Sequence, residues 1–125
     1  SNICTSQQLN ALMATLYLSL IGKSGLKKVA DLCLQKSHYA AQQISELPGF
    51  DLRYQIPYFK EFVVKTTIDP AQLVHDLSRS KIHAGLDLRR FPGMDLDDCL
   101  LVAVTERRTK QQIDLFVESL AALSD

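Results

Sequence analysis

The sequence has no excess of charge of either sign, and this absence removes two classes of partner. Its 125 residues contain 14 Lys and Arg against 14 Asp and Glu, so the formal net charge at pH 7 is +0. A protein that holds nucleic acid or an anionic membrane through its electrostatic field needs an excess of positive charge. We therefore expect neither nucleic acid nor a membrane surface among its partners.

The sequence also has few cysteines and no long apolar run. Cys4, Cys33 and Cys99 are an odd number with no short spacing between any two, which argues against a disulfide framework and against a zinc ribbon. Lys23 and Ser24 interrupt the longest apolar stretch before it reaches the length of about 18 residues that a membrane span needs. No secretory signal pattern is visible. A reducing, cytoplasmic setting is the expectation that follows.

An apolar stretch in the first third, residues 5–47, organises the chain. Helical spacing places a first set of apolar side chains on one face, namely Leu9, Leu12, Met13, Leu16, Tyr17 and Leu20. Further apolar residues, Leu18 and Ile21 among them, fill the other sides, so this helix needs cover on several sides. Thr5 and Gln8 form a capping box at its start. The sequence predicts a break at 22–25 and a second helix that ends before Pro48.

The rest of the chain alternates between strand and helix patterns. We predict, in order, strands over 50–56 and 62–66 that form a hairpin, a helix that begins at Pro70, strands over 82–88 and 99–104, and a helix that begins after Thr109. Asp69 with Gln72, and Thr109 with Gln112, are expected to form capping boxes. The predicted fold class is α+β, with a mainly antiparallel sheet of three to four strands and helices on one face.

No set of residues amounts to a self-contained catalytic site. The three histidines, His38, His75 and His83, lie on different predicted elements without the spacing of metal ligands, and we expect surface positions for them. The arginine pairs at 89–90 and 107–108 are interpreted as solvated. The alternative for these pairs is a contact with an anion or a substrate carboxylate, because arginine binds carboxylates with two parallel hydrogen bonds.

Several strings of the sequence resemble one known family. They are Ser1-Asn2-Ile3-Cys4-Thr5 followed by Gln8, the segments 14–18, 22–26, 61–64 and 84–88, and Leu100-Leu101-Val102-Ala103-Val104-Thr105-Glu106-x-Arg108-Thr109-Lys110. Together they are similar to the end of subunit 1, the alpha subunit, of the glycine decarboxylase P-protein of the glycine cleavage system. The resemblance extends over nearly the whole chain, and its last string is the most specific.

The resemblance implies a fold and a place in a larger protein. P-protein subunits have the fold of aspartate-aminotransferase-like, fold type I enzymes, with a large domain and a small carboxy-terminal domain. Residues 1–47 are then helices that link to a missing large domain, and residues 48–125 are the small domain, together one folded unit cut from a longer chain. This implication accounts for the first helix, whose outer sides the missing large domain would cover.

The resemblance also implies an activity, that of an oxidoreductase. In the family, the heterotetrameric holoenzyme decarboxylates glycine on pyridoxal phosphate and passes the aminomethyl group to the lipoyl group of the H-protein. The Schiff-base lysine belongs to the large domain, so none is expected in this chain. The implied partners are glycine dehydrogenase subunit 2 (beta), lipoylated H-protein and the missing large domain. The chain itself is expected to be structural and inactive alone.

The expected site residues follow from these implications. No catalytic residue and no metal ligand is expected in the chain. Residues near the cofactor or an interface are Ser1, Asn2, Cys4 and Thr5, and the expected interface residues are Leu12, Tyr17, Leu18, Ile21 and Arg108. Two alternatives remain open: a small domain of another fold type I enzyme, such as an aminotransferase or a cysteine desulfurase, and a free-standing α+β regulatory module.

Overall fold

The structure, a computed structural model, describes residues 7–124. The chain divides into two compact units, with the boundary between Asp31 and Leu32. Helix α1 (Gln8–Ser45) runs through both units, and the element order continues with four strands, two further α-helices and one short 3-10 helix. The predicted α+β class is confirmed, and each unit is described by itself below.

The first unit consists of the amino-terminal part of α1. The sequence predicted a break over residues 22–25, and the structure confines it to Gly22, whose φ of 59° and ψ of −175° are non-helical. Glycine adopts this conformation because it has no Cβ to clash with the neighbouring carbonyl groups. The predicted break is therefore confirmed, as a kink at Gly22 between two helical parts of α1. The predicted cap at Thr5 lies outside the described residues.

The second unit contains a four-stranded antiparallel sheet in the order β1-β2-β4-β3. The strands are β1 (Phe50–Leu52), β2 (Glu61–Thr66), β3 (Leu86–Asp87) and β4 (Cys99–Ala103). The predicted hairpin of β1 and β2 is confirmed, with Phe50 opposite Thr66. Because side chains alternate along a strand, the buried pairs Phe62 with Val102 and Val64 with Leu100 mark one face of the sheet as the core face.

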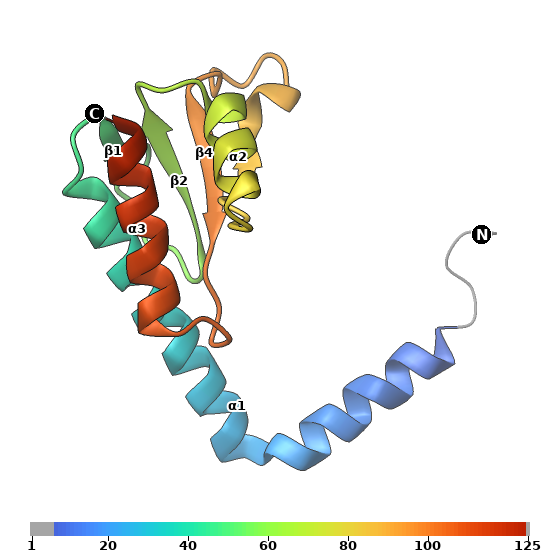
Figure 1. Cartoon of the computed structure of the whole chain (residues 1–125). Coiled ribbons are helices and arrows are strands. Elements are labelled where there is room, and N and C mark those ends of the chain that lie inside the picture. Colours follow the sequence, from blue (N-terminus) through green and yellow to red (C-terminus); the bar gives the residue numbers. More distant parts are fainter. Residues whose placement is uncertain (1–6, 125) are drawn as a thin grey trace. The chain divides into compact units, whose positions relative to one another are not determined.

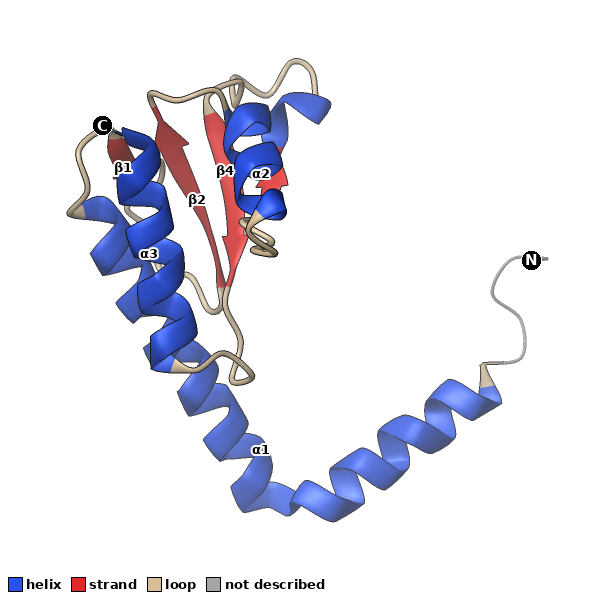
Figure 2. Ribbon diagram, viewed as in Figure 1, coloured by secondary structure: helices blue, strands red, loops and turns tan. Residues whose placement is uncertain are grey.

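Helices cover this core face and complete a two-layer sandwich. They are the carboxy-terminal part of α1, α2 (Pro70–Arg79) and α3 (Lys110–Ser124), which Figure 1 and Figure 2 show against β2 and β4. Their contributions to one continuous apolar core include Ala40 and Ile44 from α1, Leu73 and Leu77 from α2, and Ile113 and Leu120 from α3. The compact unit that carries the sheet thus begins at Leu32 and includes part of α1.

Two predicted strands are shorter in the structure than in the sequence analysis. The strand predicted over 50–56 ends at Leu52, and Ile56, expected to be half-buried, is 65% exposed. The strand predicted over 82–88 is reduced to Leu86–Asp87. Gly85, with a φ of 148°, interrupts its regular backbone, and Asp87 then accepts a hydrogen bond from the Arg89 amide and begins a 3-10 helix, η1 (Leu88–Arg90).

The predicted helix caps are confirmed with one exception. The Asp69 carboxylate accepts hydrogen bonds from the amides of Ala71 and Gln72 at 2.8 and 3.1 Å. The Gln72 side chain was expected to close a capping box there, and this was wrong, because it donates to Asp76 at 2.7 Å instead. The second capping box is complete: Thr109 and Gln112 each accept from the backbone amide of the other, at 3.2 and 3.0 Å.

Candidate functional site

The first candidate site is the apolar surface of the first unit. Within residues 9–20, seven large apolar side chains are between 48% and 85% exposed, and we call them the apolar helix surface: Leu9, Leu12, Met13, Leu16, Tyr17, Leu18 and Leu20. Leu12, Tyr17 and Leu18 are among the predicted interface residues and are exposed, whereas Ile21 is half-buried. A continuous apolar surface of this kind marks a site of protein–protein contact, because isolated soluble domains rarely leave one uncovered.

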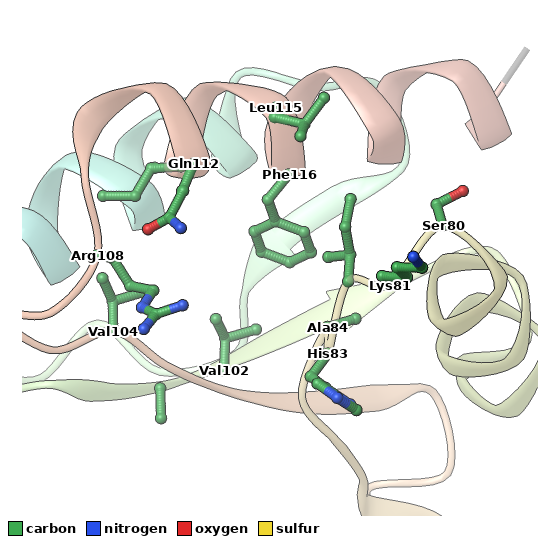
Figure 3. A pocket seen from close by; sticks show the side chains of 13 residues that line it. Ser80, Lys81, His83, Ala84, Val102, Val104, Arg108, Gln112, Leu115 and Phe116 are labelled. Atoms are coloured by element: carbon green, nitrogen blue, oxygen red, sulfur yellow. The ribbon is translucent and has the colours of Figure 1, made fainter.

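The second candidate site is a cavity of about 280 Å³ in the second unit. It lies between α3, the end of β4 and the segment that follows α2, as Figure 3 shows. Its floor is apolar and is formed by Ile82, Ala84, Val102, Val104, Ile113 and Phe116. Its polar lining comes from Ser80, Lys81, His83, Arg108 and Gln112.

The cavity has a positive electrostatic character. No aspartate or glutamate lines the cavity, whereas two cationic residues, Arg108 and Lys81, line it. Within residues 7–124 neither of these two cations forms an ion pair, although nearby Arg89 and Lys110 are both paired with carboxylates. The positive charge of Arg108 and Lys81 is thus available to an anion that enters the cavity.

A network of contacts to α1 fixes the turn that carries Arg108. The buried Cys33 thiol donates to the Glu106 carboxylate at 3.3 Å, and the Glu106 amide donates back to the same sulfur at 3.3 Å. The Lys36 ammonium donates to the carbonyl oxygen of Glu106. The Arg108 amide closes the turn by donating to the Thr105 carbonyl oxygen at 3.2 Å. Arg108 therefore projects from a turn that is tied to α1 at one end and to the α3 cap at the other.

The other charged groups of the second unit serve the fold. The Arg89 guanidinium bridges Asp69 at the start of α2 and Asp87 at the start of η1, each at 2.9 Å. The hydrogen bonds from Arg89 lower the pKa of Asp87. The hydrogen bond from the Gln72 backbone amide is the main cause that lowers the pKa of Asp69, and the hydrogen bond from the Arg89 side chain also lowers it. These ion pairs connect the start of α2 to the start of η1, and we call Arg89, Asp69 and Asp87 together the clamp.

The buried thiol of Cys99 is not a nucleophile at neutral pH. Burial, together with the neighbouring Asp98 carboxylate, raises the pKa of Cys99 to about 11. Because the thiolate is the reactive form, a thiol with this pKa is inert at neutral pH. Among the described residues there is also no cluster of three His, Cys, Asp or Glu side chains that could hold a metal ion.

The residues of the cavity do not fit pyridoxal phosphate. A site for this cofactor holds it through a lysine and an acidic or basic partner for the pyridine nitrogen, and surrounding contacts have to keep both residues in place. Lys81 and Arg108 line the cavity, but both are exposed residues, and neither forms an ion pair within residues 7–124. The cavity is therefore not built to orient this cofactor.

The remaining predicted residues have diverse positions. Ser1, Asn2, Cys4 and Thr5 lie outside the described residues. All three histidines are exposed, as expected. His38 stacks on Tyr58 with ring centroids 4.3 Å apart, and His83 lines the cavity. No helix in the described part of the chain is long and apolar enough to cross a membrane.

The fold of the second unit and its neighbours among solved structures define a class of protein. A phosphoserine aminotransferase from Cytophaga hutchinsonii superposes on 86% of this chain with a TM-score of 0.61 at 16% identity, and 29% of that chain is covered. A crystal structure of the glycine decarboxylase (P-protein) of the glycine cleavage system, in inhibitor-bound form, superposes with a TM-score of 0.84 at 27% identity, over 98% of this chain and 28% of that one. The chain therefore has the fold of one part of the aminotransferase-like, fold type I proteins.

The sequence comparisons narrow this class to one family. The profile of the Glycine cleavage system P-protein family matches residues 1–120, and the chain belongs to this family. A probable glycine dehydrogenase (decarboxylating) subunit 1 from Prosthecochloris aestuarii is 51% identical over 99% of the chain. The protein of that name from Chlorobaculum tepidum is 46% identical over 98% of it. The chain spans 27% of the length of each of these relatives.

Proposed function

We propose that this chain acts as the small, carboxy-terminal domain of subunit 1 of glycine dehydrogenase (decarboxylating). In the holoenzyme, glycine is decarboxylated and its aminomethyl group passes to the lipoyl group of the H-protein, with pyridoxal phosphate as the electron sink. The partners are subunit 2 (beta), lipoylated H-protein and the large domain of the same subunit, and the setting is cytoplasmic. The division into linking helices over 1–47 and a small domain over 48–125 remains part of this proposal.

The observation that carries the proposal is the identity of 51% over 99% of the chain to a subunit 1 of this enzyme. An identity of this size extends over both units, including the apolar helix surface. The aminotransferase alternative has only a fold-level likeness at 16% identity in its favour. A free-standing regulatory module would not leave the apolar helix surface exposed, because it would have no larger protein to cover it.

The contribution of the chain is to assembly rather than to chemistry. The described residues offer an exposed apolar helix surface and a second unit with one apolar core. We propose that Leu12, Tyr17, Leu18 and Ile21 pack against the large domain or a second subunit, and that residues 1–5 lie close to the cofactor or an interface. The apolar helix surface also makes the isolated chain self-associate, because nothing within the first unit covers it.

The proposal is tested by exchanging the segment between proteins. The matching segment of subunit 1 from Prosthecochloris aestuarii is replaced with this chain, and the chimera is combined with subunit 2, pyridoxal phosphate and lipoylated H-protein. Exchange of labelled bicarbonate into glycine is measured, with omission of subunit 2 or of the H-protein as controls. We expect exchange within about tenfold of the unaltered enzyme, lost in both omissions.

The opposite result has a clear meaning. A chimera that is folded, assembled with subunit 2 and loaded with cofactor, and yet shows no exchange, contradicts the assignment to this enzyme. Leu20→Glu in the chimera is expected to weaken assembly with the rest of the protein, because it places a charge in a covered apolar contact. Its control is Lys28→Glu, which changes charge at an exposed, polar position of the same helix.

A further inference from the structure

We propose that the cavity between β4 and α3 binds a small organic monocarboxylate, with Arg108 as the residue that holds its carboxylate. The hydrocarbon part of this ligand lies on the apolar floor around Phe116 and Val102. This inference concerns residues of the second unit and stands apart from the proposed decarboxylase function. It adds a binding site to a domain for which we have proposed an assembly role.

The size of the cavity limits the ligand. Its volume of about 280 Å³ lies at the lower end of the range of about 300–1,000 Å³ that is usual for small-molecule sites. A short aliphatic or aromatic acid fits, because its hydrocarbon part can take the place of water over the apolar floor.

The positive charge of the cavity determines the sign of the charge that the ligand carries. Arg108 approaches from the turn before α3 and Lys81 from the segment after α2, with the Phe116 ring between them in Figure 3. Because no carboxylate lines the cavity and neither cation forms an ion pair within the described residues, a cationic ligand is disfavoured. An anion is attracted from both sides.

The chemistry of Arg108 favours a carboxylate among the anions. A guanidinium group donates two parallel hydrogen bonds that match the two oxygens of a carboxylate. The Gln112 side chain, which also lines the cavity, can donate a further bond from its amide. The apolar floor beside these groups can cover a hydrocarbon tail, which a free phosphate lacks, so an acid with a hydrocarbon tail is the better match.

The experiment is a titration of the ¹⁵N-labelled 125-residue chain with hexanoate, followed by NMR. We expect saturable shifts at the amides of Ala84, Val102 and Phe116, with a Kd of about 1 mM, as for a ligand of this size. Hexan-1-ol and hexylammonium, which have the same tail without the negative charge, are expected to give no saturable shifts. Acetate, which lacks the tail, is expected to bind at least about tenfold more weakly.

Variants separate the role of Arg108 from that of positive charge in general. Arg108→Gln is expected to weaken hexanoate binding at least about tenfold, because it removes charge-assisted hydrogen bonds. Arg107→Gln, one position away and outside the cavity lining, is the matched control and is expected to leave the Kd unchanged. Arg108→Lys keeps the charge without the planar fork and is expected to show an intermediate Kd.

The possible contradicting results are distinct. Shifts that never saturate, equal binding of hexan-1-ol, or an equal loss in Arg107→Gln overturn the site. Inorganic phosphate that binds more tightly than hexanoate overturns the carboxylate class. The spectra of both variants away from the cavity show whether the fold is kept. Because Arg108 is exposed on a turn, we expect its substitution to leave the fold unchanged.

Discussion

The two parts of helix α1 contain similar residues and meet opposite surroundings. Leu20 in the first unit is 85% exposed, whereas Ile44 in the second is 0% exposed. Both positions belong to apolar stripes that the sequence pattern identifies equally well. The pattern thus shows which face of a helix is apolar, and the packing partner decides whether that face is a core or a contact surface. This difference is the basis of the assembly role that we propose.

The largest expected effect comes from shortening an apolar side chain in each part of α1. Ile44→Ala removes a fully buried side chain from the core and is expected to lower the free energy of unfolding by about 2–5 kcal/mol. Leu20→Ala is expected to change it by no more than about 0.5 kcal/mol. Urea unfolding of the second unit, followed by circular dichroism, measures both. Equal losses in the two variants would show that the exposed part of α1 is packed in the chain.

Two glycines, Gly85 in the second unit and Gly22 in the first, extend the comparison of the two units to the backbone. Gly85 has a φ of 148°, and a Cβ there would lie 2.3 Å from the carbonyl oxygen of Leu101. Gly85→Ala is expected to destabilise the second unit by about 3 kcal/mol, because the new methyl group meets backbone atoms in a strained conformation. Urea unfolding at pH 7 measures this loss.

Gly22 provides the matched control for this glycine. A Cβ added at Gly22 would lie in open space, with no atom outside its own helix backbone and chain neighbours within 4 Å. Gly22→Ala is expected to straighten α1 and to raise its helix content, because alanine is a better helix former by about 1 kcal/mol. A loss of helical circular dichroism in Gly22→Ala contradicts this expectation.

A serine pair tests the same contrast with polar groups. The Ser37 hydroxyl is fully buried and lies 2.6 Å from the carbonyl oxygen of Phe59. Ser37→Ala is expected to cost about 0.5–1.5 kcal/mol, because it removes the hydrogen bonds of a fully buried hydroxyl. Ser19 is exposed and bonds only within its own helix, to Thr15 at 2.7 Å. Ser19→Ala is expected to be neutral within about 0.5 kcal/mol, and a comparable loss in both variants is the contradicting result in the same unfolding assay.

The smallest expected effect is the acid dependence of the clamp around Arg89. The pKa values of Asp69 and Asp87 are lowered in the folded chain. Groups with lowered pKa values stabilise the fold above the unfolded pKa of about 3.9, and this contribution is lost as the pH falls through the folded pKa values. Arg89→Gln raises both pKa values toward 3.9, so we expect a smaller loss of stability between pH 5 and about pH 2.

Unfolding in urea at several pH values measures this slope. Arg53→Gln is the control, because its partner Asp95 is almost fully exposed and exposed pairs of this kind contribute little. An acid slope that is unchanged in Arg89→Gln would show that the clamp does not contribute to stability. An equal change in both variants would show that the effect is one of net charge.

The sequence was most informative where local chemistry decides the structure. Asp69 with Pro70, and Thr109 with Gln112, predicted the starts of α2 and α3 because caps depend on neighbouring residues. The strand predicted over 82–88 was too long, because a close approach of Gly85 to β4 is a long-range contact that alternation does not encode. Gln72 closed no capping box, because Asp76 one turn on competes for its side chain.

The two candidate sites also differed in how far the sequence predicted them. The apolar helix surface was visible in the sequence, since too many sides of one helix were apolar. The cavity was not, because it combines three segments that are separate in the sequence: the segment after α2, β4 and α3. Only the arginine pair at 107–108 gave a signal, through the alternative of a carboxylate contact. The expected subunit contact of Arg108 stays a prediction.

Hydrogen exchange of residues 9–20 tests the central claim most directly. The claim is that the apolar helix surface is covered in the assembled P-protein. Amide exchange is compared between the 125-residue chain at low concentration and the chimeric enzyme assembled with subunit 2, with residues 40–44 as the internal reference. We predict fast exchange of residues 9–20 in the chain, at least about 100-fold slower exchange in the assembled enzyme, and slow exchange of the reference in both. Equally fast exchange of residues 9–20 in an assembled enzyme that exchanges bicarbonate into glycine would contradict the account.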